Sequence, residues 1–198
     1  MEFPAAGEEE EEEEAVSPSG EYLKSSKLDL TILGVLEFQN PIDDSPTLLL
    51  IDRVFLPINP RFSSIMVADE TGAKKWKRVR VNLQDHVKVP VFPADMRAEY
   101  YDGCFREYLT SIAAEPLPQD RPLWEIHVVK YPTKVAAGNL VFKIHHSLGD
   151  GYSLMGALLS CLQRLDDPLM PLTFPSRKST AVTHDGARRI HLLRRARR

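Results

Sequence analysis

Two adjacent histidines followed by an acid form the segment of this sequence best suited to chemistry. Residues 145–151 read HHSLGDG, an HHxxxDG pattern. A neutral imidazole is the side chain best suited to accept a proton near pH 7, and an acid four residues later can orient the ring or the loop. The candidate catalytic residues are therefore His146 and His145, with Asp150 as the organiser of the loop and Gly151 as the residue that opens the next helix.

Other interpretations of the same segment have to be weighed against catalysis. Two histidines and an aspartate can ligate zinc or iron. Adjacent residues of a strand point to opposite faces, which argues against both rings holding one ion, so no metal is expected. His145 and His146 could also be hydrogen-bonded residues at a strand end without a chemical role. Ser147 lacks the G-x-S-x-G turn of a serine nucleophile. A histidine base remains the favoured interpretation of the whole pattern.

Two hydrophobic periodicities alternate along the chain and predict the elements that hold this segment. A period of 2 is typical of strands and a period of 3.6 of helices. Their alternation predicts an α/β fold, with a mixed sheet covered by helices. The expected strands are Leu28 to Phe38, Ser64 to Val67, Trp76 to Leu83, Leu123 to Tyr131, and Asn139 to His145, with Gly138 and Asn139 in the turn before the last one. The expected helices are a segment capped by Ser45, opened by Pro46 and stopped by Pro57, residues 98–114, and a helix from Gly151 to Leu165.

The last expected strand leads directly into the HHxxxDG segment. Its alternation, continued to the motif, puts His146 on the apolar side with Phe142 and Ile144, and His145 on the opposite side with Lys143. We therefore do not expect the two rings to act as one pair. A junction from strand to helix is a common place for functional groups in α/β proteins.

Composition and charge divide the chain into three parts. The 198 residues are 43% hydrophobic and 27% charged, as is typical of a globular protein, and the net charge is -3. We expect residues 1–14 to be a disordered acidic tail, 15–176 a folded domain, and 177–198 a disordered basic tail. No apolar run approaches the length of a membrane span, and no signal peptide is visible, so secretion is not expected. Cys104 and Cys161 are expected to be free thiols.

Three further segments accompany the HHxxxDG pattern. They are Ser17 to Leu23 (SPSGEYL), Asn59 to Ser64 (NPRFSS) and Pro122 to Glu125 (PLWE). With them, the chain resembles the plant wax ester synthase/diacylglycerol acyltransferase family, which has a chloramphenicol acetyltransferase-like fold. The resemblance implies that residues 15–176 are the N-terminal half of a two-domain acyltransferase and that the second half is absent.

The resemblance implies an O-acyltransferase. The histidine at the position of His146 would be the general base that deprotonates a fatty alcohol or diacylglycerol hydroxyl, which then attacks a long-chain acyl-CoA directly. Acyl-CoA is a substrate, and no cofactor or metal is implied. Trp124 could line an acyl channel and Arg61 could approach a CoA phosphate. The alternatives are core packing for Trp124 and a structural ion pair for Arg61.

Partners and location follow from the resemblance and its substrates. Because lipid acceptors lie in membranes, we expect peripheral contact with the cytosolic face of the endoplasmic reticulum or with the plasma membrane, and no nucleic-acid partner. The surface left by the absent half would favour self-association. The alternative function is a truncated, non-catalytic chain that binds acyl groups or regulates a full-length relative by pairing with it.

Overall fold

The computed structural model describes residues 14–25 and 27–161. The acidic tail up to residue 13, the basic tail over residues 177–198 and the expected end of the last helix lie outside the described residues. Glu14 differs from the prediction, because it belongs to a short strand, β1 (Glu14–Ala15), that pairs with β4.

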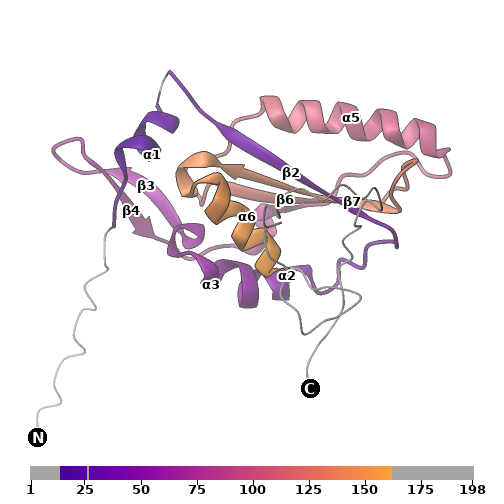
Figure 1. Cartoon of the computed structure of the whole chain (residues 1–198), viewed down its shortest axis with the longest axis horizontal. Helices are drawn as coiled ribbons and strands as arrows, with labels where there is room; N and C mark the ends of the chain where they lie inside the picture. Colours follow the sequence, from indigo (N-terminus) through magenta and orange to yellow (C-terminus); the bar gives the residue numbers. More distant parts are fainter. Residues whose placement is uncertain (1–13, 26, 162–198) are drawn as a thin grey trace, which may run out of the picture.

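Two sheets form the framework of the described chain (Figure 1). The larger sheet has the strand order β2-β7-β6-β5, in which β5 runs parallel to β6 and the other neighbours are antiparallel. The smaller sheet has the order β1-β4-β3 and is antiparallel. The strands are β2 (Thr31–Phe38), β3 (Ser64–Ala68), β4 (Lys74–Arg78), β5 (Val87–Lys88), β6 (Trp124–Val129) and β7 (Gly138–His145).

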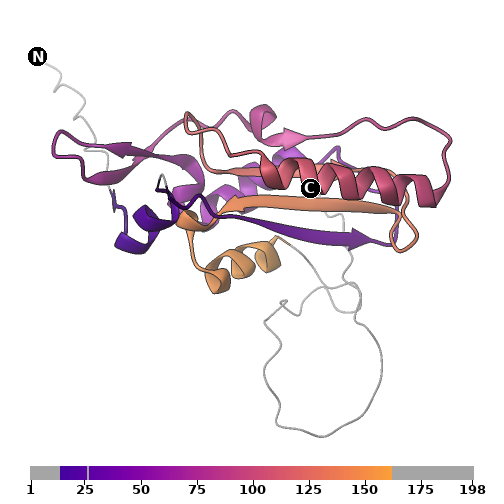
Figure 2. The ribbon, with the colours of Figure 1, turned by 90° about the horizontal axis from the view of Figure 1, so that it is seen from above.

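Helices cover both faces of the larger sheet, which confirms the predicted fold class. Figures 1 and 2 show α5 on one side of strands β2, β6 and β7, with α6 on the other side. The expected helix over residues 98–114 is confirmed as α5. The helices are α1 (Pro18–Leu23), α2 (Thr47–Leu50), α3 (Leu56–Ile58), α4 (Leu83–His86), α5 (Ala98–Ala114) and α6 (Gly151–Ser160), with a π-helical turn η1 (Ile51–Phe55) and two 3-10 turns, η2 (Pro60–Ser63) and η3 (His146–Leu148).

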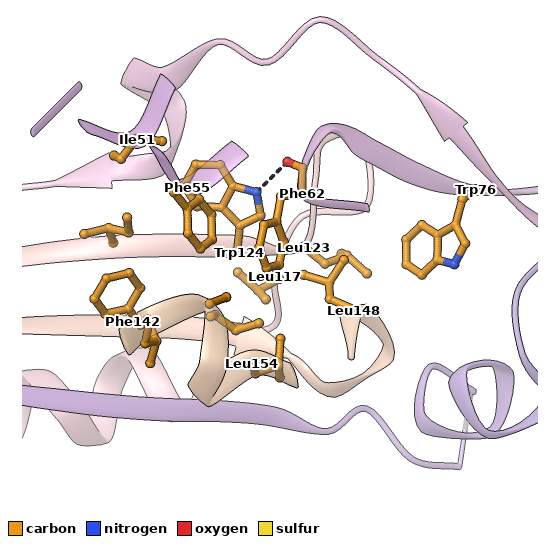
Figure 3. Close-up of a cluster of buried hydrophobic side chains, with 14 of the residues drawn as sticks. Ile51, Phe55, Phe62, Trp76, Leu117, Leu123, Trp124, Phe142, Leu148 and Leu154 are labelled. Atoms are coloured by element: carbon orange, nitrogen blue, oxygen red, sulfur yellow. Dashed lines mark hydrogen bonds between the residues drawn. The ribbon is translucent and has the colours of Figure 1, made fainter. Parts of the chain in front are cut away.

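The hydrophobic core lies between the larger sheet and the helical segments η1, η2 and α6 (Figure 3). Phe55 and Phe62 stack with their ring centroids 4.2 Å apart, and Trp124 meets Phe55 edge-on at 5.0 Å. The indole N–H of Trp124 donates to the carbonyl of Phe62 at 2.8 Å, so even its polar atom is satisfied inside the core. Removing a buried aromatic side chain of this kind costs about 3 to 5 kcal/mol. This cluster fixes the segment before β3 onto strands β6 and β7.

The helical segment after Ser45 differs from the prediction. The Ser45 hydroxyl donates to Asp43 at 2.5 Å and caps no helix, and α2 begins only at Thr47. The chain then widens into the π-helical turn η1, and Pro57 lies inside α3 instead of stopping the helix. A proline has no N–H to donate. Because η1 already interrupts the regular α-helical hydrogen bonds, the missing donor is tolerated there.

Several strand ends also differ from the prediction. The strand expected from Trp76 to Leu83 begins earlier, at Lys74, and Leu83 instead opens α4. Gly138 opens β7 instead of lying in the preceding turn. Leu28 lies before β2, in the loop that the backbone bridge between Lys24 and Asp29 closes. Strand ends depend on pairing with neighbouring strands more than on local preference, so hydrophobic alternation locates them only approximately.

Candidate functional site

The HHxxxDG residues form a tight turn between β7 and α6, at the predicted junction from strand to helix. β7 ends at His145, and the 3-10 turn η3 (His146–Leu148) follows immediately. Neighbouring backbone holds the turn at two points. The N–H of His145 donates to the Leu123 carbonyl at 3.0 Å, and the N–H of His146 donates to the Leu30 carbonyl at 2.9 Å.

The three segments that accompany the motif in the sequence surround this turn in space. Helix α1, from the first segment, packs against η3. The Asn59 side chain, from the second, donates to the Leu148 carbonyl at 3.4 Å and accepts from the Arg61 N–H at 2.9 Å. Leu123, from the third, accepts the N–H of His145. Tertiary folding therefore brings all four sequence features to one end of the larger sheet.

His145 is completely buried, and both of its ring nitrogens lie close to polar groups. Nδ1 accepts the backbone N–H of Ser147 at 3.0 Å and lies 2.7 Å from the Ser147 hydroxyl. Nε2 lies 2.9 Å from Oδ1 of Asp29. Burial lowers the pKa of His145 and nearby Lys24 lowers it further, against the opposing effect of Asp29. A neutral ring whose Nδ1 accepts carries its proton on Nε2, the nitrogen nearest the Asp29 carboxylate. This close contact is not aligned as a hydrogen bond.

His146 differs from its neighbour in being only partly buried. Its Nδ1 is enclosed and has no hydrogen-bond partner within the part of the chain that the structure describes. The turn is held through the main chain of His146, whose N–H donates to Leu30, and not through Nδ1 of its ring. Since Nδ1 is enclosed, Nε2 is the candidate nitrogen for contact with a substrate. This arrangement suits a group that must accept and return a proton.

Asp150 and Gly151 lie where the turn enters α6. Asp150 is exposed and accepts the backbone N–H of Ser153 at 2.7 Å, so it is the N-cap of the helix. The same hydrogen bond lowers the pKa of the Asp150 carboxyl. Gly151 is exposed, and a Cβ added there would meet no atom within 4 Å. The described structure gives no steric reason for glycine at this position.

Trp124 and Arg61 make contacts of the kind that the structural alternatives anticipate. Trp124 is fully buried in the core, where it also stacks on His86 with the ring centroids 4.1 Å apart. Arg61 pairs with Glu14 of β1, and its guanidinium lies 5.9 Å from the centre of the Trp76 ring. These contacts are packing and ion pairing. The substrate roles of both residues stay predictions.

Sequence reasoning missed a second buried cluster, on the α5 face of the larger sheet. The Tyr108 hydroxyl and Nδ1 of His127 are 2.7 Å apart, and Nε2 of His127 lies 3.4 Å from Oε2 of Glu125. The same oxygen lies 3.6 Å from Nζ of Lys143, a side chain that is only 1% exposed. Charged residues inside otherwise apolar strands, at positions 125 and 143, are the signal that could have revealed this cluster.

Ionisation in this second cluster is governed by its burial and its internal pairs. Burial raises the pKa of Tyr108 to about 12, with the Glu125 charge adding to the effect. Burial acts to raise the pKa of Glu125 as well, but His127 and Lys143 outweigh it and leave that pKa below its ordinary value. His127 thus lies between the Tyr108 phenol and the Glu125 carboxylate, and its contact with Tyr108 connects β6 to α5.

A small apolar cavity lies on the other face of the sheet, beneath α2 and η1. Its volume is about 70 Å³, and its walls include Phe38, Ile42, Phe142 and Cys161. Burial raises the pKa of the Cys161 thiol to about 11, and both cysteines are free, as predicted.

Two features are absent from the described part of the chain. Among the described residues, no group of three or more His, Cys, Asp or Glu side chains is arranged to hold a metal ion. No helix over residues 14–25 and 27–161 is long and apolar enough to cross a membrane.

Comparison with solved structures defines the class of fold. The first condensation domain of the CDA synthetase matches with a TM-score of 0.59 and 16% identity, over 75% of this chain and 38% of that one. The wax ester synthase/diacylglycerol acyltransferase from Marinobacter aquaeolei VT8 matches with a TM-score of 0.50 and 19% identity, over 71% of this chain and 36% of that one. The fold is therefore that of the chloramphenicol acetyltransferase-like domains.

Sequence comparison identifies the family within this class. Residues 53–197 match the family model of the wax ester synthase/diacylglycerol acyltransferase catalytic domain. Wax ester synthase/diacylglycerol acyltransferase 4 of Arabidopsis thaliana is 31% identical over 189 residues, which cover 92% of this chain and 36% of that protein. The chain belongs to this family, as the resemblance implies, and it spans about a third of the length of the curated relatives it matches.

Proposed function

We propose that this chain carries the general base of an acyl-CoA-dependent O-acyltransferase that makes wax esters or triacylglycerol. In this proposal, Nε2 of His146 takes the hydroxyl proton of a fatty alcohol or diacylglycerol as the oxygen attacks the thioester carbonyl. The C–O bond forms, the C–S bond breaks, and the proton passes from His146 to the departing CoA thiolate. The products are an ester and free CoA, and no covalent acyl-enzyme is required.

The partial exposure of His146, directly after a buried strand, is the observation that carries the proposal. A base must be reachable by its substrate and must keep one nitrogen unoccupied. His145 meets neither condition, since it is fully buried and both of its nitrogens lie within 3.0 Å of polar groups. Family membership supports the reaction type, and the local geometry supports the choice between the two histidines.

The roles proposed for the other motif residues are indirect. Asp150 would organise the loop as the N-cap of α6. No metal or prosthetic group takes part in the proposed reaction, in which acyl-CoA is a substrate. Because the substrates in the family's name are lipids, we propose peripheral contact with the cytosolic face of the endoplasmic reticulum or with the plasma membrane. Exposed Leu48 and Leu49 on α2 are apolar groups suited to contact with lipid or with a second chain.

The test is ester formation by the 198-residue chain. Purified protein is incubated with palmitoyl-CoA and either hexadecanol or diacylglycerol, thiol release is followed, and the ester is separated by chromatography. The His146→Ala variant is assayed beside it, with and without added imidazole, and circular dichroism checks that both proteins are folded. Ester that depends on His146 and on the acceptor, with partial recovery of the variant by imidazole, would support the proposal.

Two results would contradict the proposal. Equal rates in the wild type and in His146→Ala would exclude His146 as the base. Absence of ester from a folded wild-type chain would show that this chain alone is not the catalyst. Binding of palmitoyl-CoA without turnover would then favour the acyl-binding alternative.

A further inference from the structure

The loop between α1 and β2 carries an ion pair that reaches the HHxxxDG turn. Nζ of Lys24 lies 2.5 Å from Oδ2 of Asp29, and the backbones of the two residues form an antiparallel bridge. The Lys24 side chain is only 8% exposed, against 38% for Asp29. Oδ1 of Asp29 lies 2.9 Å from Nε2 of His145. One carboxylate therefore contacts a lysine and a histidine at the same time.

The residue after Asp29 holds the next residue of the motif. The carbonyl of Leu30 accepts the N–H of His146 at 2.9 Å, and β2 then continues antiparallel to β7 with Thr31 opposite His145. Two consecutive residues of the loop thus bind two consecutive residues of the motif. Asp29 acts through its side chain and Leu30 through its main chain.

The ring of His145 links this loop to the turn beyond it. Its Nδ1 accepts the backbone N–H of Ser147, the second residue of η3. That hydrogen bond requires Nδ1 to be free of a proton. A carboxylate at Nε2 favours the proton on Nε2 and so leaves Nδ1 free. If the proton moved to Nδ1, it would face the Ser147 N–H and weaken the hold on the turn.

We propose that Lys24 and Asp29 are positioning residues for the reaction: the pair holds His145 in its neutral Nε2–H form, and His145 in turn fixes the turn that presents His146. This inference rests on the proposed role of His146 as the base. Lys24 orients the Asp29 carboxylate. Neither residue touches the reacting atoms, so both act through the position of the His146 ring.

A second lysine–aspartate pair in the chain provides a control with the same chemistry and a more exposed lysine. Nζ of Lys130 lies 2.6 Å from Oδ2 of Asp44, with side chains 41% and 32% exposed. Lys130 directly follows the last residue of β6. Trp124, at the other end of β6, is the residue that pairs next to the turn, with Ile144 of β7. The control pair thus has the same chemistry and a similar N···O distance, but it lies at the other end of β6 from the turn.

The experiment compares Asp29→Ala, Asp29→Asn and the control Asp44→Ala in the full chain. Nitrogen-15 NMR of the histidine side chains reports which ring nitrogen of His145 carries the proton. Ester formation is measured in parallel, with kcat and KM determined separately. We expect Asp29→Ala to lose the exclusive Nε2–H form and to lower kcat by about 10 to 100-fold with little change in KM, because a small displacement of a catalytic group can cost about that much. Asp29→Asn should recover most of the loss, since its amide oxygen can take the place of the carboxylate oxygen beside Nε2.

The outcomes separate this inference from the proposed function. Asp44→Ala should keep both the NMR signature and the rate of the wild type, because an exposed ion pair contributes little. If Asp29→Ala keeps the His145 tautomer of the wild type, or has the kcat of Asp44→Ala, the positioning role is wrong. If the wild type makes no ester, the NMR comparison still decides whether Asp29 sets the tautomer. If Asp29→Ala does not fold, Lys24→Met replaces it as the variant expected to lose the effect, and Asp29→Asn remains the variant expected to keep it.

Discussion

Two polar clusters, each built around a buried residue of β7, lie on the same face of the larger sheet, and they differ in what they hold. The turn cluster consists of Lys24, Asp29, His145 and Ser147, at the end of β7. The helix cluster consists of Tyr108, Glu125, His127 and Lys143, beneath α5. β7 supplies one member of each, two residues apart, and both members are at most 1% exposed.

The difference between the clusters shows why burial and charge alone do not identify a functional site. The helix cluster connects β6 and β7 to a side chain of α5, so its contacts are internal to the scaffold. The turn cluster holds the main chain of a turn that contains His146, a partly exposed residue whose Nδ1 has no hydrogen-bond partner among the described residues. Whether a buried polar cluster indicates function therefore depends on whether it positions a side chain that a substrate can reach. The predictions below test this distinction, beginning with the largest effect.

Replacing His146 and, separately, His127 should separate a loss of activity from a loss of stability. His146→Ala should lower the rate of ester formation by about 10² to 10⁴-fold, the usual contribution of a general base, and leave the unfolding midpoint nearly unchanged. His127→Ala should instead lower the unfolding midpoint, because it leaves the Tyr108 hydroxyl without its partner in the helix cluster. Thermal unfolding and steady-state rates of both variants check this. A large stability loss in His146→Ala would remove the contrast.

Neutralising Glu125 should break the helix cluster. In Glu125→Gln, the nearly inaccessible ammonium of Lys143 loses the carboxylate 3.6 Å away. Leaving a buried charge unpaired should cost about 3 kcal/mol of unfolding free energy. Urea unfolding measures the loss, and the double variant Glu125→Gln with Lys143→Met should recover part of it. Equal stability of the wild type and Glu125→Gln would show that the helix cluster is not needed to hold α5.

Acid should weaken the fold through the buried histidines. Burial lowers the pKa of both His86 and His145 from the ordinary value of 6.5. Because the folded state disfavours their protonation, the stability they contribute is fully present above pH 6.5 and is lost as the pH falls through the lowered values. Each can contribute a slope of at most about 1.4 kcal/mol per pH unit. Urea unfolding between neutral and mildly acidic pH checks this, and a flat profile would contradict it.

Removing the cap of α6 should have the smallest effect. Asp150→Ala loses the acceptor for the Ser153 N–H, so the unfolding midpoint should fall by a few degrees, whereas Asp150→Asn should keep most of the cap. Because that hydrogen bond lowers the pKa of Asp150 from 3.8, the contribution is present above pH 3.8 and is lost as the pH falls through the lowered value. Differential scanning calorimetry at neutral and strongly acidic pH measures both effects. A midpoint for Asp150→Ala equal to that of the wild type would exclude the cap.

Local patterns predicted the parts of the fold whose periodicity is long and regular. The amphipathic helix over residues 98–114 and the strands ending near Val129 and His145 agree with the structure within about two residues. The segment from Ser45 to Pro57 was predicted less well, because a π-helical turn has no periodic signature that distinguishes it from an α-helix. Alternation also predicted that His145 lies on the side of Lys143, where the structure places it.

The sequence by itself determined the family, the fold class and the position of the HHxxxDG turn. These follow from local patterns and from a motif whose residues are adjacent in the sequence. Only the tertiary structure decided which histidine is fully buried between polar groups and which is partly exposed. That distinction depends on Asp29 and Leu30, more than a hundred residues before the motif along the chain. They reach it because β2 pairs with β7, and no local pattern encodes the distance between two groups that meet only when strands pair.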